Sequence, residues 1–294
     1  MSFQLGPITL GTVPRIAGIV QRPVPQAELN DLYRAGVSIL EFRADAFPGG
    51  PDALQSYLPT VDVSRFGLLG TIRVDFPPDA EIVANDTTAP GAAPRVAAFT
   101  ALLPLVDAID VEVESPERVQ LVALARQAGR GVVLSSHDFT KTPPLTRLQT
   151  IVAEANRLNV DVLKLAVFAH NQQDLLDLLQ FTRDCRFPNR VMIAMGPWGL
   201  LSRVAAPFFG SLISYGFIDQ PNAPGQLSVS ELHAEFLRYH PDYRAEYETR
   251  LAVEIFGTID LYADNSRIHT DSHNNSGRGS RRSCDSPAVH VTGN

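Results

Sequence analysis

The sequence contains almost no lysine and almost no cysteine. Of its 25 basic residues only Lys141 and Lys164 are lysines, and all the others are arginines. Cys185 and Cys284 are its two cysteines, so no disulfide framework is indicated. Sparse cysteine of this kind is typical of proteins in a reducing compartment. We therefore expect a cytoplasmic protein that is stabilised by packing rather than by cross-links.

Long apolar runs and a positive net charge are also missing. No run approaches the roughly 18 apolar residues of a membrane span, and the first residues lack the basic and apolar segments of a secretory signal. The net charge is -7, which gives no indication of nucleic acid or an anionic membrane as a partner. No GxGxxG sequence follows the first predicted strand, so a dinucleotide-binding fold has no support. We expect a soluble protein with a small-molecule partner.

One repeated pattern organises the chain, in which a short apolar run is followed by a stretch with helical periodicity. The apolar runs that predict strands occupy residues 15–20, 38–43, 67–73, 108–114, 131–136, 161–167, 190–195 and 212–217. The stretches that predict helices include residues 26–35, 117–128, 145–158 and 172–181. Such alternation predicts βαβ units and a parallel sheet. Eight units in about 250 residues favour a closed (β/α)8 barrel, the TIM barrel, over an open doubly wound sheet.

The same pattern predicts the domain organisation. Residues 4–12 precede the first strand and are expected to pair as a short N-terminal hairpin. With 45% hydrophobic residues the chain can bury one large core, and we expect residues 1–260 to form a single barrel catalytic domain. The last helix of this domain is expected within residues 241–259. Residues 261–294 are rich in Ser, Asn, Gly and Arg, a composition typical of a disordered tail.

Lys164 lies in the middle of the apolar run DVLKLAV, residues 161–167, which predicts a buried strand. Lysine is almost never fully buried without a partner, and because burial disfavours the charged form we expect its pKa to be lowered. An amine of lowered pKa can form a Schiff base with a ketone, which arginine cannot do. The alternative is a structural lysine whose stem packs on the barrel while its ammonium reaches water.

Charged side chains gather where the predicted strands end, which is the end of a barrel that carries its chemistry. They are Glu41, Arg43, Asp45, Arg73, Glu112, Glu114 and His137. The first three alternate in the sequence EFRAD, so we expect them on one face, as an ion-pair network or as ligands of substrate hydroxyls. His137 follows the strand before that of Lys164 and is a candidate general base and acid, with a loop hydrogen-bonding role as the alternative.

Two loops after the last strands carry groups suited to an anion. In MGPWGLLSRVAAPFFGS, residues 195–211, we expect Ser202 and Arg203 to open a helix whose backbone amides and guanidinium bind a carboxylate or a phosphate. The alternative is a tight turn with a surface arginine. The loop NAPGQ, residues 222–226, is expected to reach over the site from the last strand.

Several short sequences occur in a specific order along the chain: EFRAD, TIR, SHDF, DVLKLA, MGPWGLLSR, FGS and APGQ. Together they resemble the type I 3-dehydroquinate dehydratases of the shikimate pathway, over residues 15–239. The resemblance implies elimination of water from 3-dehydroquinate to give 3-dehydroshikimate, a step of aromatic amino acid biosynthesis. It also implies a homodimer that uses neither a metal nor an organic cofactor.

The resemblance further implies roles for particular residues. Lys164 would form the Schiff base, and His137 would act as general base and acid. The residues implied to bind the substrate are Glu41, Arg43, Arg73, Arg203, Asn222 and Gln226, with Asp45 in a supporting role. Asn222 stands where the family usually has a serine, and Pro77 stands where it usually has a glutamate that orients the histidine.

Two other functions are compatible with the sequence. A class I aldolase also uses a barrel lysine and a Schiff base, and a phosphate-binding loop near the last strands would favour it. The second alternative is a divergent, non-catalytic paralogue that binds a related metabolite, and Asn222 and Pro77 motivate it. The presence of both Lys164 and His137 argues against a pure binder, which has little use for a buried amine.

Overall fold

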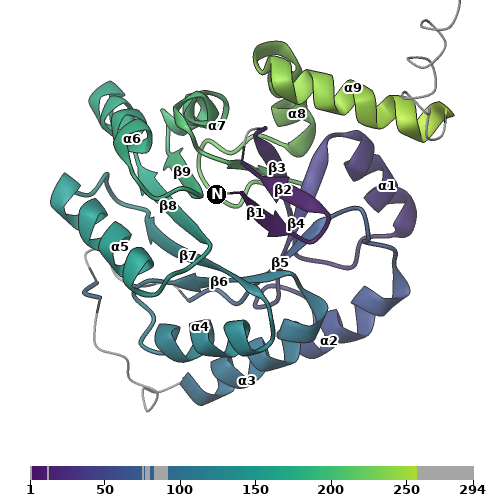
Figure 1. Cartoon of the computed structure of the whole chain (residues 1–294), viewed down its shortest axis with the longest axis horizontal. Coiled ribbons are helices and arrows are strands. Elements are labelled where there is room, and N and C mark those ends of the chain that lie inside the picture. Colours follow the sequence, from purple (N-terminus) through teal and green to yellow (C-terminus); the bar gives the residue numbers. More distant parts are fainter. Residues whose placement is uncertain (1, 12, 75, 77–79, 83–91, 257–294) are drawn as a thin grey trace, which may run out of the picture. The chain divides into compact units, whose positions relative to one another are not determined.

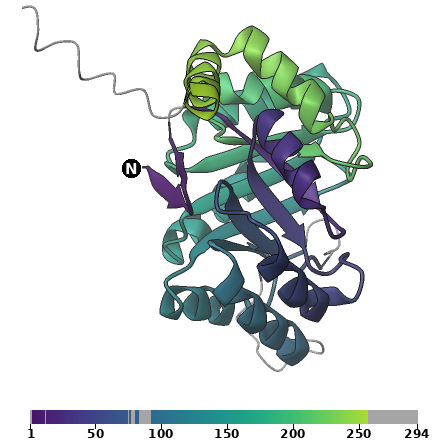
Figure 2. The same ribbon diagram turned by 90° about the vertical axis from the view of Figure 1, so that its right-hand side faces the viewer.

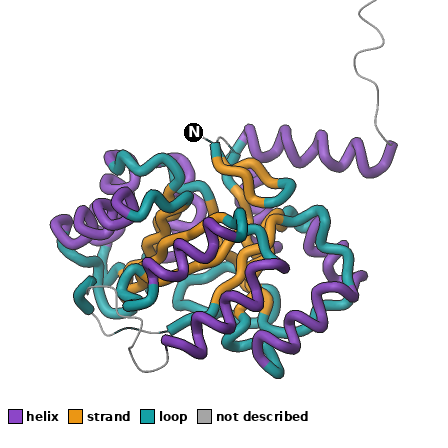
Figure 3. The backbone as a smooth tube through the Cα atoms, turned by 60° about the horizontal axis from the view of Figure 1, so that its bottom comes forward, coloured by secondary structure: helices purple, strands orange, loops and turns teal. Residues whose placement is uncertain are grey.

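The computed structural model describes residues 2–11, 13–74, 76, 80–82 and 92–256. In this part of the chain eight parallel strands form a nearly closed barrel with helices around it (Figure 1), so the predicted TIM barrel is confirmed. Figure 3 shows the strands of the barrel enclosed by its helices. The predicted tail, residues 261–294, and the position Pro77 lie outside the described residues.

The barrel strands follow one another almost entirely in chain order. They are β3 (Arg15–Val20), β4 (Val37–Arg43), β5 (Gly67–Thr71), β6 (Ala108–Glu112), β7 (Gly131–Asp138), β8 (Val162–Phe168), β9 (Arg190–Met195) and β10 (Ile213–Phe217). Each strand from β3 to β9 pairs with the next, and β10 pairs with β3. A bridge between Arg190 and Ser211 joins the strand segments at β9 and β10, where the Leu212 amide also donates to the Arg190 carbonyl at 2.9 Å. The carboxyl ends of all these strands therefore meet at one end of the barrel.

Helices alternate with the strands, and the four predicted helical stretches are confirmed. The helices are α1 (Gln26–Arg34), α2 (Gly50–Tyr57), α3 (Ala92–Leu102), α4 (Arg118–Gln127), α5 (Leu145–Arg157), α6 (Gln172–Asp184), α7 (Gly199–Ala205), α8 (Val229–Tyr239) and α9 (Pro241–Phe256). Short 3-10 helices follow α2, α3 and α7 at Leu58–Thr60, Leu103–Leu105 and Ala206–Phe209. Polar side chains cap the starts of two described helices, α6 and α8. At α6, the Asn171 side chain accepts a hydrogen bond from the Asp174 backbone amide at 3.0 Å.

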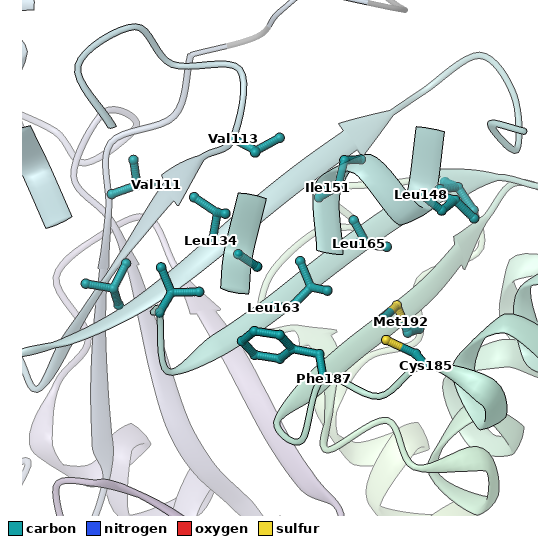
Figure 4. Close-up of a cluster of buried hydrophobic side chains, with 14 of the residues drawn as sticks. Val111, Val113, Leu134, Leu148, Ile151, Leu163, Leu165, Cys185, Phe187 and Met192 are labelled. Carbon is teal, nitrogen blue, oxygen red and sulfur yellow. The ribbon is translucent and has the colours of Figure 1, made fainter. Parts of the chain in front are cut away.

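Both faces of the sheet are buried, which is why its strands are almost continuously apolar. In β8, Leu163 and Leu165 point outward and belong to the same apolar cluster as side chains of α5 (Figure 4). Val162 and Ala166 point into the barrel. Because successive side chains of a strand alternate between faces, Lys164 points inward with them. The alternation of β8 thus places an amine inside the barrel.

The N-terminal hairpin covers the barrel at the end where the strands begin. Its strands, β1 (Phe3–Leu5) and β2 (Ile8–Leu10), pair antiparallel as predicted. Leu5 and Leu10 are buried in a cluster with inward residues near the strand starts, such as Ala108 of β6. Figure 2 shows the hairpin on one side of the barrel. Since the hairpin fills this end, the carboxyl end is the end of the described barrel whose interior stays open to a ligand.

The last two described helices pack against the first strand and the first helix of the barrel, β3 and α1. Ser228 and Glu231 form a capping box that begins α8. Arg250 of α9 donates to the Tyr33 carbonyl of α1 at 2.8 Å. Helix α9 as far as Leu251 belongs to the same compact unit as the barrel. Of the described helices, none combines the length and the apolar composition that a membrane crossing requires.

Candidate active site

The carboxyl ends of the strands surround a cavity of about 380 Å³. Its polar lining consists of Glu41, Arg43, Arg73, His137, Lys164, Arg203, Tyr215, Asn222 and Gln226. Its apolar lining consists of Ile19, Phe139, Ala166, Ile193, Met195 and Ala223. Every predicted site residue lines this cavity except Asp45, which pairs with one that does. A larger hollow of about 700 Å³ is lined by residues of α5 and α6, and it contains none of the predicted residues.

Lys164 lies deep in this cavity, with its side chain 5% exposed. Its Nζ donates a hydrogen bond to Asp110 Oδ2 at 2.9 Å and lies 3.5 Å from Glu41 Oε1. The two carboxylates come from β6 and β4, so three strands bring these charges together. The ammonium is buried among carboxylates, so it does not reach bulk water as the alternative of a structural lysine supposed.

The pKa of Lys164 is raised, so the prediction from burial alone was wrong. Burial favours the neutral amine, but the Asp110 and Glu41 carboxylates outweigh that effect and raise the pKa above its ordinary value. Burial acts on Asp110 too, but the Lys164 and Arg73 cations lower the pKa of its carboxyl. The free protein thus holds Lys164 as an ammonium, and a nucleophilic attack by its nitrogen must begin with loss of a proton.

Replacing Asp110 with asparagine is expected to lower the pKa of Lys164, because its burial stays and its closest carboxylate is removed. The chain has two lysines, so the spectrum of protein labelled at the lysine Cε carbon is simple, and Lys141→Arg assigns both signals. In the wild type the Lys164 signal should keep its ammonium position beyond roughly pH 10, the ordinary lysine pKa. A Lys164 titration that is the same in Asp110→Asn as in the wild type would contradict the pairing.

Glu41 and Arg43 project into the cavity from β4, two residues apart. Thr71 of the neighbouring strand β5 donates to Glu41 Oε1 at 2.9 Å. Asp45 holds Arg43 from beyond the strand end, with Nη2 2.7 Å from Oδ2 and Nε 3.0 Å from Oδ1. Burial would lower the pKa of Arg43, but this bidentate pair raises it. The EFRAD sequence therefore provides an ion pair and a cavity lining at once.

His137 is the next-to-last residue of β7, inside the strand rather than after it as predicted. Ser135 pairs with Lys164 across β7 and β8, and His137 lies two residues further on the same face. Arg73 Nη1 lies 3.2 Å from His137 Nδ1. Since arginine has no acceptor, Nδ1 accepts this hydrogen bond and the proton of the neutral ring is on Nε2. Burial, together with the Arg73 and Lys164 cations, holds the pKa of His137 well below its ordinary value, so the ring is neutral near pH 7.

Arg73 is fixed by the carboxylates of β6. Its Nη1 donates to Glu112 Oε1 at 2.9 Å, and its Nη2 lies 3.4 Å from Asp110 Oδ2. Glu112 is also paired with Arg95, a buried residue of α3. Burial raises the pKa of Glu112, even though both arginines favour its ionised form. A continuous set of charges thus runs from α3 to His137 and fixes the position of that histidine.

Arg203 is a buried cation that makes no ion pair with a carboxylate in the part of the chain that the structure describes. It lies in the last turn of α7, not at the helix start as predicted, and is 3% exposed. Its Nη1 donates to the Tyr215 carbonyl at 3.5 Å, and its Nε has no hydrogen-bond partner among the described residues. Burial lowers the pKa of this guanidinium to about 10. A desolvated cation in this state is suited to an incoming anion.

The rest of the predicted anion loop has a structural role. Ser202 Oγ donates to the Gly199 carbonyl at 2.7 Å and accepts from the Ala194 amide at 3.0 Å, which ties α7 to β9. Among the described residues that line the cavity, none comes from the first turn of α7. The prediction that backbone amides of this helix face the site was therefore wrong. Of the described residues of α7, Arg203 is the one that lines the cavity and gives it a positive charge.

Two loops close one side of the cavity and are fastened to each other. The Gly196 amide, after β9, donates to the Pro224 carbonyl, after β10, at 3.1 Å. Gly225 has a φ of 72°, and a Cβ there would lie 2.5 Å from the Gly196 carbonyl oxygen, so only glycine fits. The side-chain oxygen of Gln226 accepts a hydrogen bond from the backbone amide of Asn222 at 2.7 Å. The NAPGQ loop thereby brings both amide side chains to the cavity, as predicted.

Comparison with known proteins agrees with this geometry. The family described as type I 3-dehydroquinase matches residues 24–239. The chain belongs to this family. The 3-dehydroquinate dehydratase of Aquifex aeolicus is 28% identical, with 77% of this chain and 99% of that chain covered and a TM-score of 0.63.

Two further solved structures show the same fold at lower identity. The 3-dehydroquinate dehydratase of Geobacillus kaustophilus is 24% identical, with 82% of this chain and 98% of that chain covered and a TM-score of 0.67. The type I enzyme of Clostridium difficile is 22% identical, with 85% and 99% covered and a TM-score of 0.65. At these identities the likeness supports the barrel fold alone.

Sequence reasoning missed three side chains that interact with Lys164 or His137 in the described structure, namely Asp110, Phe139 and Tyr215. Asp110 lies two residues before Glu112 on β6, and the period of two along a strand was the pattern that could have revealed it. Phe139 stacks on His137, with ring centroids 6.1 Å apart and an angle of 16°. Tyr215 lies on β10 and carries no charge that would mark it. In the described ranges, no group of three or more His, Cys, Asp or Glu side chains is arranged to hold a metal ion.

Proposed function

We propose that this member of the type I 3-dehydroquinase family removes water from 3-dehydroquinate through a Schiff base on Lys164 and releases 3-dehydroshikimate. The substrate carries a ketone, a carboxylate and hydroxyl groups on one ring. One observation carries the proposal: a single cavity is lined by the buried amine of Lys164 and by the buried guanidinium of Arg203, whose Nε has no partner among the described residues. The amine suits the ketone, the guanidinium suits the carboxylate, and Glu41 and Arg43 suit the hydroxyls.

Imine formation begins with loss of a proton from the Lys164 ammonium. The Asp110 carboxylate lies 2.9 Å from Nζ and takes that proton. The neutral nitrogen attacks the ketone carbon, and the former ketone oxygen receives one proton from this nitrogen and the proton held by Asp110. The oxygen leaves as water, which gives an iminium and returns Asp110 to its carboxylate form. This cation withdraws electrons from the neighbouring C–H bond and makes its proton acidic. The carboxylates of Asp110 and Glu41 stabilise the positive charge as it moves from the amine to the iminium.

His137 removes the acidified proton and later returns one to the leaving hydroxyl. In the free protein its Nδ1 lone pair accepts a hydrogen bond from Arg73, which also lines the cavity. A substrate hydroxyl that accepts from Arg73 competes for the same donor and releases this lone pair for proton removal. The hydroxyl one carbon further along the ring then leaves as water, and hydrolysis of the conjugated imine frees the product.

Arg203→Met is expected to raise KM for 3-dehydroquinate by roughly 10- to 100-fold with a smaller change in kcat, because hydrogen bonds to charged groups are worth about 1.5–3 kcal/mol. The melting temperature should stay the same or rise, since the variant loses a buried cation that forms no ion pair in the described chain. Arg183→Met is the control, because that side chain is 61% exposed on α6, and it should change neither quantity. An unchanged KM in Arg203→Met would exclude a carboxylate-binding role.

The two alternative functions give different results with the same protein. A dehydratase produces the ultraviolet absorbance of a conjugated enone when it is mixed with 3-dehydroquinate. An aldolase forms a borohydride-reducible adduct with a sugar phosphate and produces no enone from 3-dehydroquinate. A metabolite-binding paralogue binds 3-dehydroquinate in calorimetry but gives neither enone nor adduct. The carboxylates of β4 and β6 favour the dehydratase, because they suit a polyhydroxy carboxylate better than a sugar phosphate.

The proposal extends to assembly, location and pathway. We expect a homodimer. The apolar side chains of Leu200, Leu201 and Phe208, which are 52%, 54% and 61% exposed, support a protein interface at α7 and the 3-10 helix that follows it. Light scattering tests the dimer against the chain mass of 32.1 kDa.

Cys185 is a buried free thiol, in keeping with a cytoplasmic location. The substrate assigns the reaction to the shikimate pathway.

A further inference from the structure

Tyr215 forms one wall of the cavity and contacts the amine of Lys164. It lies on β10 and is 3% exposed. The Lys164 Nζ lies 4.1 Å from the centroid of its ring. An ammonium at this distance from a buried aromatic face is attracted to it, so the ring adds a contact that fixes Nζ beside the two carboxylates. The proposed mechanism gives Tyr215 no part, although its ring contacts the reacting nitrogen.

The hydroxyl group of Tyr215 is buried, and apart from its interaction with the Lys164 ammonium it makes no hydrogen bond with any described residue. Buried tyrosine hydroxyls usually find a partner, because an unpaired one is destabilising. Of the buried side-chain atoms that lack a partner in the described chain, this hydroxyl and Arg203 Nε both belong to residues that line the cavity. Two such atoms at one cavity point to a ligand that supplies both partners.

We propose that the Tyr215 hydroxyl donates a hydrogen bond to the oxygen of the carbinolamine, the intermediate formed when Lys164 attacks the substrate ketone. This inference rests on the proposed function, because it needs a ketone substrate at Lys164. The carbinolamine oxygen is bonded to the carbon that Nζ attacks, so it forms close to the ring against which Nζ lies. Burial raises the pKa of the Tyr215 hydroxyl, although Lys164 acts in the other direction, so the hydroxyl keeps its proton and remains a donor.

The movements of electrons and protons in this step need no other reactant. As the C–N bond forms, the π electron pair of the carbonyl moves onto oxygen, and the surplus proton of the nitrogen passes to that oxygen. Tyr215 stabilises the developing negative charge and remains a phenol. The proton that Asp110 first accepted then protonates the oxygen, which leaves as water. An ammonium and a ketone thus become an iminium and a water molecule.

Tyr215→Phe tests the inference, because it removes the hydroxyl and keeps the ring. Protein and 3-dehydroquinate are mixed, stopped with borohydride at increasing times, and the reduced adduct on Lys164 is measured by mass spectrometry. We expect the adduct to form roughly 10- to 100-fold more slowly in Tyr215→Phe, because one donor to a developing oxyanion contributes at least this much to the rate. Its melting temperature should stay close to that of the wild type, since the hydroxyl makes no hydrogen bond of normal geometry with a described residue.

Tyr57→Phe is the matched control. Its hydroxyl donates to the Val24 carbonyl at 2.7 Å and does not line the cavity. This variant should melt at a lower temperature and form the adduct at the wild-type rate, which is the opposite pattern. If Tyr215→Phe forms the adduct as fast as the wild type, the inference is overturned and the dehydratase proposal stands. If the wild type itself forms no adduct, the Schiff-base proposal is overturned and the role of Tyr215 with it.

Discussion

Lys164→Arg is expected to lower the turnover of 3-dehydroquinate by at least about 10⁴-fold, the scale of loss when a catalytic nucleophile is removed. Arginine keeps a positive charge next to Asp110 and Glu41, so the buried ion pairs can persist. A guanidinium cannot form an imine, however, and the adduct trapped by borohydride should disappear. Enone absorbance measures the turnover, and mass spectrometry of the reduced protein measures the adduct. Turnover within tenfold of the wild type would rule out Lys164 as the nucleophile.

Two comparison variants separate chemistry from stability. Lys141→Arg changes the other lysine of the chain, in the loop after β7, and should leave turnover and adduct unchanged. Lys164→Met removes the charge as well as the amine and leaves Asp110 and Glu41 without their cation. Breaking a buried ion pair in this way costs about 3–5 kcal/mol of folding free energy. Lys164→Met should therefore melt at a much lower temperature than Lys164→Arg, although both are inactive.

His137→Gln is expected to lower kcat by about 10²- to 10⁴-fold, the usual contribution of a general acid or base. Glutamine can still accept a hydrogen bond from Arg73, so the ion-pair network around it should persist. Imine formation does not depend on this histidine in the proposed mechanism, so the variant should accumulate adduct on Lys164 while it produces little enone. His170→Gln, at an exposed position after β8, should behave like the wild type. A variant that loses adduct and turnover together would show that His137 acts before the imine forms.

The pH dependence gives a second test of His137. Its pKa in the free protein is held well below the ordinary value of 6.5 by burial and by the Arg73 and Lys164 cations. A base is active when it is unprotonated, so kcat/KM should remain constant as the pH falls to 6.5. It should decline only at lower pH, as the ring becomes protonated. A wild-type acid limb centred at or above pH 6.5, absent in His137→Gln, would contradict the electrostatic account of the site.

The strands could be predicted from the sequence because each is a continuous apolar run with a turn on either side. Both bounds of Arg15–Val20 and Arg190–Met195 agree with the prediction. Strand β7 extends two residues past its predicted end, because His137 and Asp138 continue the parallel pairing with β8. The end of a strand that carries polar residues is not marked by an apolar pattern in the sequence. Its position is decided instead by hydrogen bonding to the neighbouring strand. For the same reason the strand ends, where the site lies, were the least predictable part of the fold.

The members of the site could be predicted better than their electrostatics. Glu41, Arg43 and His137 carry charge or polarity at strand ends, which the barrel rule converts into a shared location. The predicted direction of the Lys164 pKa shift was wrong because it depends on Asp110, which lies two strands away in the barrel and 54 positions away in the chain. The order of the strands in the barrel and their register decide which carboxylate pairs with which cation. Neither can be read directly from a single sequence. The unpartnered Tyr215 hydroxyl likewise becomes visible only once its surroundings are folded.

The central claim is a dehydration that passes through an imine on Lys164. The most direct test mixes the wild-type protein with 3-dehydroquinate, follows the enone by ultraviolet absorbance, and stops a parallel sample with borohydride for peptide mass spectrometry. The account predicts continuous enone formation and a single reduced adduct on the peptide that contains Lys164. Enone formation without any adduct on that peptide would contradict it, because the elimination would then proceed without the imine.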